Sequence, residues 1–295
     1  MRKEIEQAVA LLAERDAKSL EQALELLQGT VFSFTMRVCG QREDAEDTMQ
    51  EVLVKALPYL PKFANPRALL VWLYRVAKNR CLMSRRRSKF APKQALSLDE
   101  LMPGRQEFEQ IAKEGPLNPE SLAIRSQQAR QLREAIQKLP PQYRVILVLR
   151  DMESLTDEEV AEITGLRPGT VRVRLHRARL FVQKLLANAA RNSRPAKRPM
   201  VRPSIGNSKP SVKRRASCKA LFAQLSDYLD EQLDDSVCEK LEQHFDGCEP
   251  CKMFLASLES TIEQLRRAPP ESFDKEAASR LRYELLSKIP LSFTS

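Results

Sequence analysis

Four side chains near the carboxyl end of this 295-residue chain have the types and the spacing of zinc ligands. They form the pattern Cys-x25-His-x3-Cys-x2-Cys and are Cys218, His244, Cys248 and Cys251. Three thiolates and one imidazole complete the tetrahedral coordination of a structural zinc ion, so we expect one Zn2+ here and not unligated thiols beside a core histidine. Cys238 lies half a turn off this row and is open to three interpretations: a core thiol, an alternate ligand or a disulfide partner.

A second chemical pattern lies between residues 156 and 182, where basic side chains follow the spacing of a helix-turn-helix. Thr156-Asp157-Glu158-Glu159 has the form of a capping box, which begins a helix that Gly165 ends. Ala161, Gly165 and Val171 supply the small, turn-forming and branched residues that two packed helices of this motif need. On the second helix the inward stripe is Val171, Leu175, Ala178 and Val182, and the outward side carries Thr170, Arg172, Val173, Arg174 and Arg177.

The outward arginines suit DNA phosphates and the guanine edge in a major groove. Charge together with the helix-turn-helix spacing favours DNA binding over a solvated basic surface. His176 has no second ligand within one turn, so we expect it in the groove or at the surface and not on a metal.

Two helices in the amino-terminal part carry further polar groups. The first spans about residues 42–56, with an inward stripe of Ala45, Met49, Val52 and Ala56 and an outer acidic face of Asp44, Asp47 and Glu51. The second starts at Asn65-Pro66 and has a core side of Leu69, Leu73 and Val76, with Trp72 beside it and Arg75, Lys78 and Asn79 outward. Cys39 and Cys81 lie among apolar neighbours and are expected to be buried core thiols.

The composition predicts an all-α protein, because helix formers are abundant while the chain has only eight Gly, five Tyr and one Trp. The net charge of +10 is uneven, with −6 in residues 217–295 and +16 in residues 1–216. Residues 188–216 hold nine basic side chains, four prolines and no acid, which indicates a disordered basic linker. A second linker at residues 91–120 completes a division into three modules, at residues 1–90, 121–187 and 217–295.

Several segments resemble bacterial sigma factors of the extracytoplasmic-function type. Residues 139–147, 155–161 and 169–179 resemble sigma region 4, which implies that the basic helix recognises the promoter −35 element. Residues 42–52 are similar to the helix of region 2 that docks on RNA polymerase, which implies that role for Asp44, Asp47 and Glu51. The segment after Asn65-Pro66 also resembles region 2, and this resemblance implies that the −10 element is bound by Trp72, Arg75, Lys78 and Asn79. Val173 and Met83 depart from the usual family residues, which affects the base preference expected at each element.

The carboxyl-terminal module resembles the zinc-binding anti-sigma domain family, through its four ligands and through Leu225-Ser226-Asp227-Tyr228-Leu229-Asp230-Glu231. The two resemblances together imply a sigma factor fused to its own regulatory domain, with an intramolecular contact between that domain and the sigma regions. Inhibition and activation by this domain are both compatible with the sequence. Residues 252–267 and 274–289 are the surfaces expected to make the contact.

Two other functions fit the sequence less well. A stand-alone helix-turn-helix regulator of transcription does not explain the segments around Asp44 and Trp72. A zinc hydrolase needs an open coordination position and a general base, and the chain has only two histidines and no His-Glu-x-x-His pattern. We therefore expect a non-enzymatic cytoplasmic protein whose partners are core RNA polymerase and promoter DNA, and no association with a membrane, since the longest apolar run has seven residues.

Overall fold

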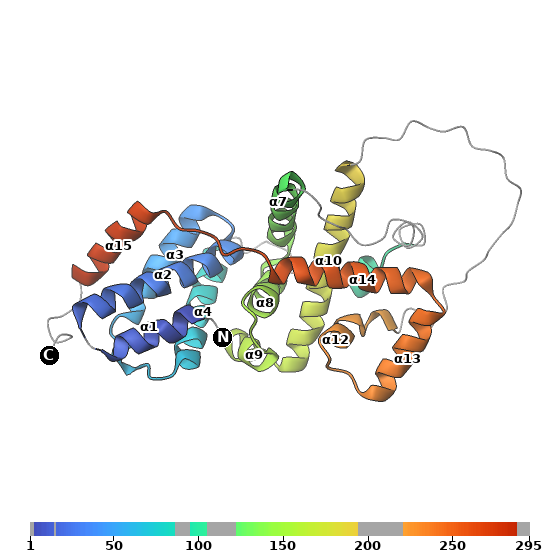
Figure 1. Ribbon diagram of the computed structural model, residues 1–295, viewed down its shortest axis with the longest axis horizontal. Helices are drawn as coiled ribbons and strands as arrows, with labels where there is room; N and C mark the ends of the chain where they lie inside the picture. The colour runs from blue at the N-terminus through green and yellow to red at the C-terminus, as the bar shows by residue number, and fades with distance from the viewer. Residues whose placement is uncertain (1–2, 15, 86–94, 105–121, 194–220, 288–295) are drawn as a thin grey trace, which may run out of the picture. The chain divides into compact units, whose positions relative to one another are not determined.

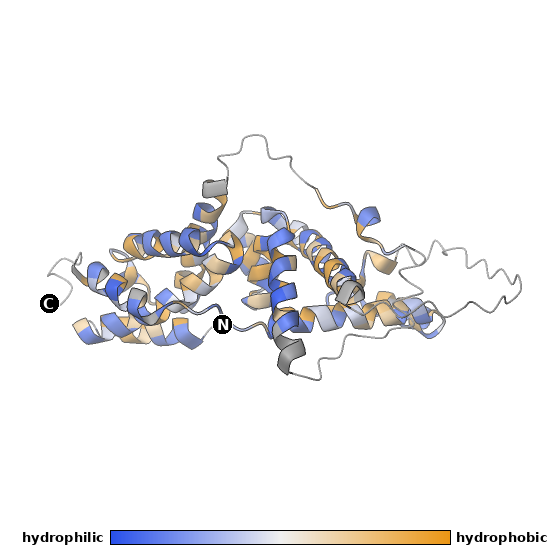
Figure 2. Cartoon of the chain, turned by 90° about the horizontal axis from the view of Figure 1, so that it is seen from above, coloured by the Kyte–Doolittle hydropathy of each residue, from blue (hydrophilic) through white to orange (hydrophobic). Residues whose placement is uncertain are grey.

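The computed structural model describes residues 3–14, 16–85, 95–104, 122–193 and 221–287. Every regular element in these ranges is helical, which confirms the predicted all-α class. Helices carry hydrophobic and hydrophilic residues side by side along their lengths (Figure 2), as amphipathic helices do. No described helix combines the length and the apolar character that a membrane span requires. The chain divides into two compact units, each built from segments distant in sequence.

Unit 1 comprises residues 1–94, 136–171 and 266–295. Its amino-terminal bundle, drawn in blue to cyan in Figure 1, contains α1 (Lys3–Ala13), α2 (Ala17–Cys39), α3 (Arg42–Ala56), a 3-10 turn η1 (Leu60–Lys62) and α4 (Pro66–Arg85). The unit continues with α8 (Pro141–Leu147), a turn of π-helix η2 (Val148–Met152) and α9 (Asp157–Thr164), and it ends with α15 (Lys275–Ser287), which lies along α2.

Local sequence explains where the bundle helices begin and end. The side chain of Asp16 caps α2 by accepting from the backbone N–H groups of Lys18 and Ser19. Gly40 ends α2 in the left-handed conformation with φ 82°, and an added Cβ there would collide with the side-chain oxygen of Gln137. Within the core the ring of Tyr74 stacks on Phe34 with 4.4 Å between centroids.

One sequence prediction about this core is wrong. Cys39 and Cys81 are buried as expected, but they form a disulfide and are not free thiols. Because α4 returns alongside α2, their Cα atoms come within 5.4 Å although 42 positions separate them in sequence. The bond closes a loop that contains the whole of α3.

Unit 2 comprises residues 95–135 and 172–265. It contains α5 (Leu98–Leu101), most of α7 (Leu122–Lys138) and most of α10 (Pro168–Ser193). Among the described residues that follow, it contains α12 (Leu225–Leu229), α13 (Asp235–Asp246) and α14 (Glu249–Arg266). Their apolar side chains share one core with α10, to which Leu180, Phe222, Leu225, Leu241, Phe254 and Leu258 belong.

Candidate functional site

The predicted zinc ligands converge where α13 gives way to α14. The ligand atoms of His244, Cys248 and Cys251 all lie within 4.8 Å of one another, and each side chain is partly exposed. Ligand atoms around a single tetrahedral zinc ion stand about 3.4–3.8 Å apart, so two thiols and one imidazole at this spacing fit that metal. Cys218 lies outside the described residues. Cys238 is half-buried, its thiol faces the carbonyl oxygen of Leu233 at 3.9 Å, and it is not a member of the ligand group.

The helix-turn-helix prediction is confirmed in its local details. The backbone N–H of Glu159 donates to Oγ1 of Thr156 at 3.3 Å, and the Glu159 carboxylate accepts from the backbone N–H of Thr156 at 2.9 Å. α9 ends at Gly165 with φ 72°. The predicted inward stripe of α10 is buried throughout, at Val171, Leu175, Ala178 and Val182. On the outward side Val173 is 52% exposed, and the other members are partly buried, at Thr170, Arg172, Arg174 and Arg177.

A third side of α10, which sequence analysis did not single out, is covered within unit 2. His176 and Arg179 share this side because they are spaced at i and i+3. The guanidinium of Arg179 is fully buried and donates to both carboxylate oxygens of Asp230, at 2.6 and 3.0 Å. Asp230 belongs to the turn that follows α12, so an acidic residue of the zinc-binding segment holds a cation of the helix-turn-helix.

His176 is buried and is therefore not the surface residue that the sequence suggested. Its Nδ1 lies 2.7 Å from Oγ of Ser226, and its ring meets the ring of Phe222 edge-on. Burial lowers the pKa of His176 to about 4, and the nearby charges of Arg179 and Arg177 act in the same direction. The imidazole is accordingly neutral near pH 7. The burial of His176 under α12 could not be predicted from the sequence. The helical period identifies a side of α10 but not the segment that packs on it.

The predicted acidic face lies on α3, whose inward residues Ala45, Met49, Val52 and Ala56 are all fully buried as expected. Asp47 is exposed, and Asp44 and Glu51 are partly buried. Glu51 accepts from Lys55 at 2.7 Å and pairs with Arg80 at 2.6 Å. The hydrogen bond from Lys55 is the main cause that lowers the pKa of Glu51, so its carboxylate is ionised near pH 7.

The residues predicted to meet the −10 element all lie on α4, but one of them is not outward. Trp72 is partly buried, and its ring centroid lies 6.2 Å from that of Tyr59 and 6.1 Å from that of Phe63. Arg75 and Asn79 are exposed as predicted. Lys78 is only 9% exposed, because α9 packs over it.

A buried polar network joins α2, α4 and η2, and no pattern in the sequence predicted it. Glu153 follows η2 and is buried. Its carboxylate accepts from Arg37 at 2.8 Å and from the hydroxyl of Tyr74 at 2.5 Å. The π-helical turn before it is closed by a bond from Glu153 N–H to the carbonyl of Val148 at 2.9 Å.

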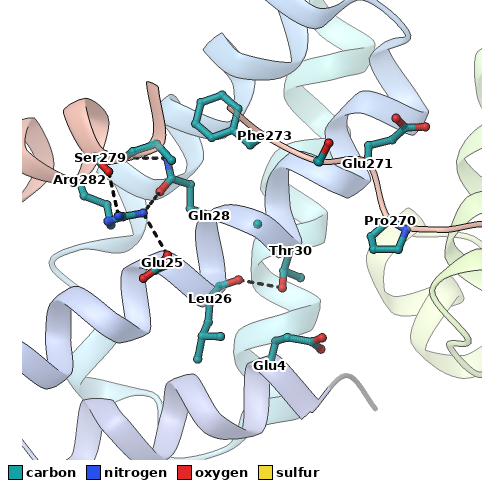
Figure 3. A pocket seen from close by; sticks show the side chains of 13 residues that line it. Glu4, Glu25, Leu26, Gln28, Thr30, Pro270, Glu271, Phe273, Ser279 and Arg282 are labelled. Atoms are coloured by element: carbon teal, nitrogen blue, oxygen red, sulfur yellow. Dashed lines mark hydrogen bonds and ion pairs between the residues drawn. The ribbon is translucent and has the colours of Figure 1, made fainter. Parts of the chain in front are cut away.

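The carboxyl-terminal segment runs along α2. Arg37 donates to the carbonyl oxygens of Ala268 and Pro269 at 3.2 and 2.8 Å, and the ring of Phe273 packs on Phe32. Figure 3 shows Arg282 of α15 reaching toward α2, where it contacts Gln28 and Glu25. A cavity of about 590 Å³ lies between this segment and α2. Residues 288 and 289 lie outside the described residues, and the regulatory contact expected of residues 274–289 stays a prediction.

Comparison with known proteins identifies the parts of the chain. Residues 24–90 match the family model "Sigma-70 region 2", and residues 129–182 match the family model "Sigma-70, region 4". Residues 218–252 match a zinc-finger family model, and this range contains all four predicted zinc ligands.

Three curated relatives share the sigma regions. The ECF RNA polymerase sigma factor SigE of Mycolicibacterium smegmatis is 32% identical over 53% of this chain and 57% of its own length. The ECF RNA polymerase sigma-E factor of Escherichia coli K12 is 31% identical over 57% of this chain and 89% of its own length. The RNA polymerase sigma-H factor of Pseudomonas aeruginosa is 30% identical over 59% of this chain and 92% of its own length.

Among solved structures, the sigma factor RpoE in complex with the anti-sigma factor NepR from Bartonella quintana is similar at 22% identity, with a TM-score of 0.39 over 58% of this chain and 98% of that one. The assignment of the chain to a family rests on the sequence relationships and the matched regions together. The chain belongs to the ECF family of RNA polymerase sigma factors, which are transcription initiation factors and not enzymes.

Proposed function

We propose that this sigma factor is held inactive by its own zinc-binding segment, which covers one side of the DNA-reading helix of region 4. In the active state, Asp44, Asp47 and Glu51 of α3 bind core polymerase. Trp72, Arg75, Lys78 and Asn79 of α4 bind the −10 element, where aromatic stacking and cation-to-phosphate contacts suit a melted strand. The −35 element is read by the outward side of α10, through Thr170, Arg172, Val173, Arg174 and Arg177.

The zinc-binding segment is proposed to hold one Zn2+ through Cys218, His244, Cys248 and Cys251. The convergence of three of these ligands supports this assignment. A closed four-ligand site is structural, and the metal would fix the junction between α13 and α14. That junction positions both helices in the core they share with α10.

Inhibition is supported above all by the pairing of Arg179 with Asp230. The bidentate geometry that Arg179 makes with this carboxylate is the geometry an arginine makes with a DNA phosphate. A duplex cannot approach the side of α10 that carries His176 and Arg179 while α12 covers it. α14 adds a contact farther along the helix, where Gln183 donates to Ser257 at 3.2 Å. Release of the segment would therefore free this side for DNA.

The experiment is run-off transcription with purified core polymerase and full-length variants. Asp230→Ala leaves Arg179 buried without this counter-charge, so the covered state loses stability and output should rise by at least about tenfold. Asp234→Ala is the matched control, since Asp234 is exposed, lies in the same turn and has the same charge. Its output should stay within about twofold of wild type. Equal output from the Asp230→Ala variant and the wild type would contradict the inhibitory role.

The metal is tested separately by elemental analysis of the full chain purified under reducing conditions. Wild type and Cys238→Ser should each carry one zinc per chain, whereas Cys218→Ser and Cys251→Ser should carry substantially less. Retention of zinc by Cys218→Ser would remove Cys218 from the ligand set. Loss of zinc from Cys238→Ser would make Cys238 a ligand in place of Cys218.

A further inference from the structure

We infer that region 4 directly covers the side of α4 proposed to bind the −10 element. The carboxyl end of α9 binds the cations of α4 that the melted strand would otherwise contact. The inference rests on the −10 role proposed for α4. It concerns only elements of unit 1 and does not involve the zinc-binding helices α12 to α14.

The contacts are specific and take up two of the four residues assigned to the −10 element. Nζ of Lys78 donates to the carbonyl oxygen of Ile163 at 2.8 Å. The guanidinium of Arg75 donates to the carbonyl oxygen of Glu162 at 2.7 Å, and its nitrogen lies 3.5 Å from the carboxylate of the same residue. A third pair joins Arg67, at the start of α4, to Glu159 at 3.0 Å.

The last turn of α9 is suited to this role as a substitute for phosphate. Carbonyl groups at the end of a helix have no partner within the helix, and the helix dipole gives them a partial negative charge. Lys78 and Arg75 satisfy two of these carbonyls. Burial under α9 also lowers the pKa of Lys78, with a smaller contribution from the charge of Arg75. A strand of DNA would offer the same cations phosphate oxygens, so α9 and DNA compete for one set of donors.

The closure is a packed interface and does not depend on surface ion pairs alone. Arg144 of α8 donates to the carbonyl oxygen of Val38 at the end of α2, at 2.9 Å. Gln137 donates to the carbonyl oxygen of Arg37 at 3.1 Å, and the carboxylate of Glu153 binds the side chain of Arg37. These bonds hold the same two sigma regions together, so α9 is kept over α4 by several independent contacts.

Reactivity of Lys78 toward an amine-acylating N-hydroxysuccinimide ester measures the closure in the full-length protein. Acylation at each lysine is followed by mass spectrometry of peptides. Lys55 is the internal reference because its side chain is 56% exposed. In wild type, Lys78 should react at least about tenfold more slowly than Lys55, because reaction requires opening of the interface.

Charge reversal at the edge of the interface should open it without touching the residues proposed to bind DNA. In Arg67→Glu/Glu162→Arg, each new side chain repels its former partner, and the acylation rate of Lys78 should rise about tenfold. Glu46→Arg is the matched control, since Glu46 pairs with Arg42 on the surface of α3, and it should leave the rate unchanged. Glu153→Gln provides a second variant that weakens the buried contacts and should also raise the rate.

Failure of this inference can be told apart from failure of the proposed inhibition. In Asp230→Ala, Lys78 should stay as protected as in wild type, whatever happens to transcription. The inference is overturned if wild-type Lys78 reacts as fast as Lys55, if neither interface variant accelerates its reaction, or if Asp230→Ala exposes it as fully as the charge reversal does.

Discussion

Replacing Glu153 by glutamine removes one charge from the buried network of unit 1 and changes almost nothing else. In wild type the carboxylate has no exposed surface and receives Arg37 and the hydroxyl of Tyr74. The Arg37 side chain is itself only 4% exposed. Glutamine has the same shape and keeps one oxygen that can accept from Arg37, so the packing is preserved while the counter-charge is lost.

The expected loss follows from the burial of both partners. Removing one member of a buried ion pair destabilises a protein by about 3–5 kcal/mol, and the retained acceptor places Glu153→Gln at the lower end, at about 3 kcal/mol. For a folded unit of roughly 150–250 residues, each kcal/mol lowers Tm by about 2–4 °C, so Tm should fall by about 6–12 °C. The exposed pair Arg42 and Glu46 provides the reference, because Glu46→Gln should change stability by less than about 0.5 kcal/mol.

Differential scanning calorimetry of the full-length variants measures both changes. Adding Arg37→Met to Glu153→Gln should recover part of the loss, because the uncompensated charge is then gone. Recovery will be incomplete, since Arg37 also donates to the carbonyl oxygens of Ala268 and Pro269. If Glu153→Gln melts within about 2 °C of wild type, as Glu46→Gln should, the network does not stabilise the closed arrangement.

Two further predictions concern His176 and the disulfide. The pKa of His176 is lowered to about 4 in the folded protein. The contribution of the neutral ring to stability is therefore fully present above about pH 6.5, where the unfolded histidine is also neutral. It is lost as the pH falls toward 4, by at most about 3 kcal/mol. Urea unfolding at pH 7 and pH 4.5 should therefore show a smaller loss for His176→Gln than for wild type, and equal losses would contradict the buried neutral ring. The Cys39–Cys81 bond spans 42 positions, so Cys39→Ser/Cys81→Ser should lower the free energy of unfolding by about 4 kcal/mol, while Cys238→Ser should leave it unchanged.

The sequence predicted the parts of the structure that neighbouring residues determine. The capping box at Thr156 and the turn at Gly165 depend on a few adjacent positions, and both form as expected. The buried stripe of α10 follows from the helical period alone, as does the inward side of α3. Convergence of His244, Cys248 and Cys251 needs only the end of one helix and the start of the next, so it too was predictable.

Contacts between distant segments were not predictable in the same way. Helical periodicity showed that Lys78 and His176 lie away from the inward stripes of their helices, and both were therefore expected to be exposed. Each is buried because another segment packs over it, α9 in the first case and α12 in the second. The disulfide was missed for the same reason, since apolar neighbours predict burial of a cysteine but not the approach of a second one.

The proposed closures have a consequence for how activation can be driven. Lys78 and Arg179 each have an oxygen partner in the closed protein, a carbonyl in one case and a carboxylate in the other. Replacing that partner by a DNA phosphate exchanges one charge-assisted hydrogen bond for another, so the net gain from these two residues is small. A ligand shifts a conformational equilibrium only by its difference in affinity for the two states. The free energy for opening must therefore come from contacts that the closed state lacks. Two exposed side chains are available for such contacts: Asp47 on α3 for polymerase, and Val173 on α10 for −35 bases.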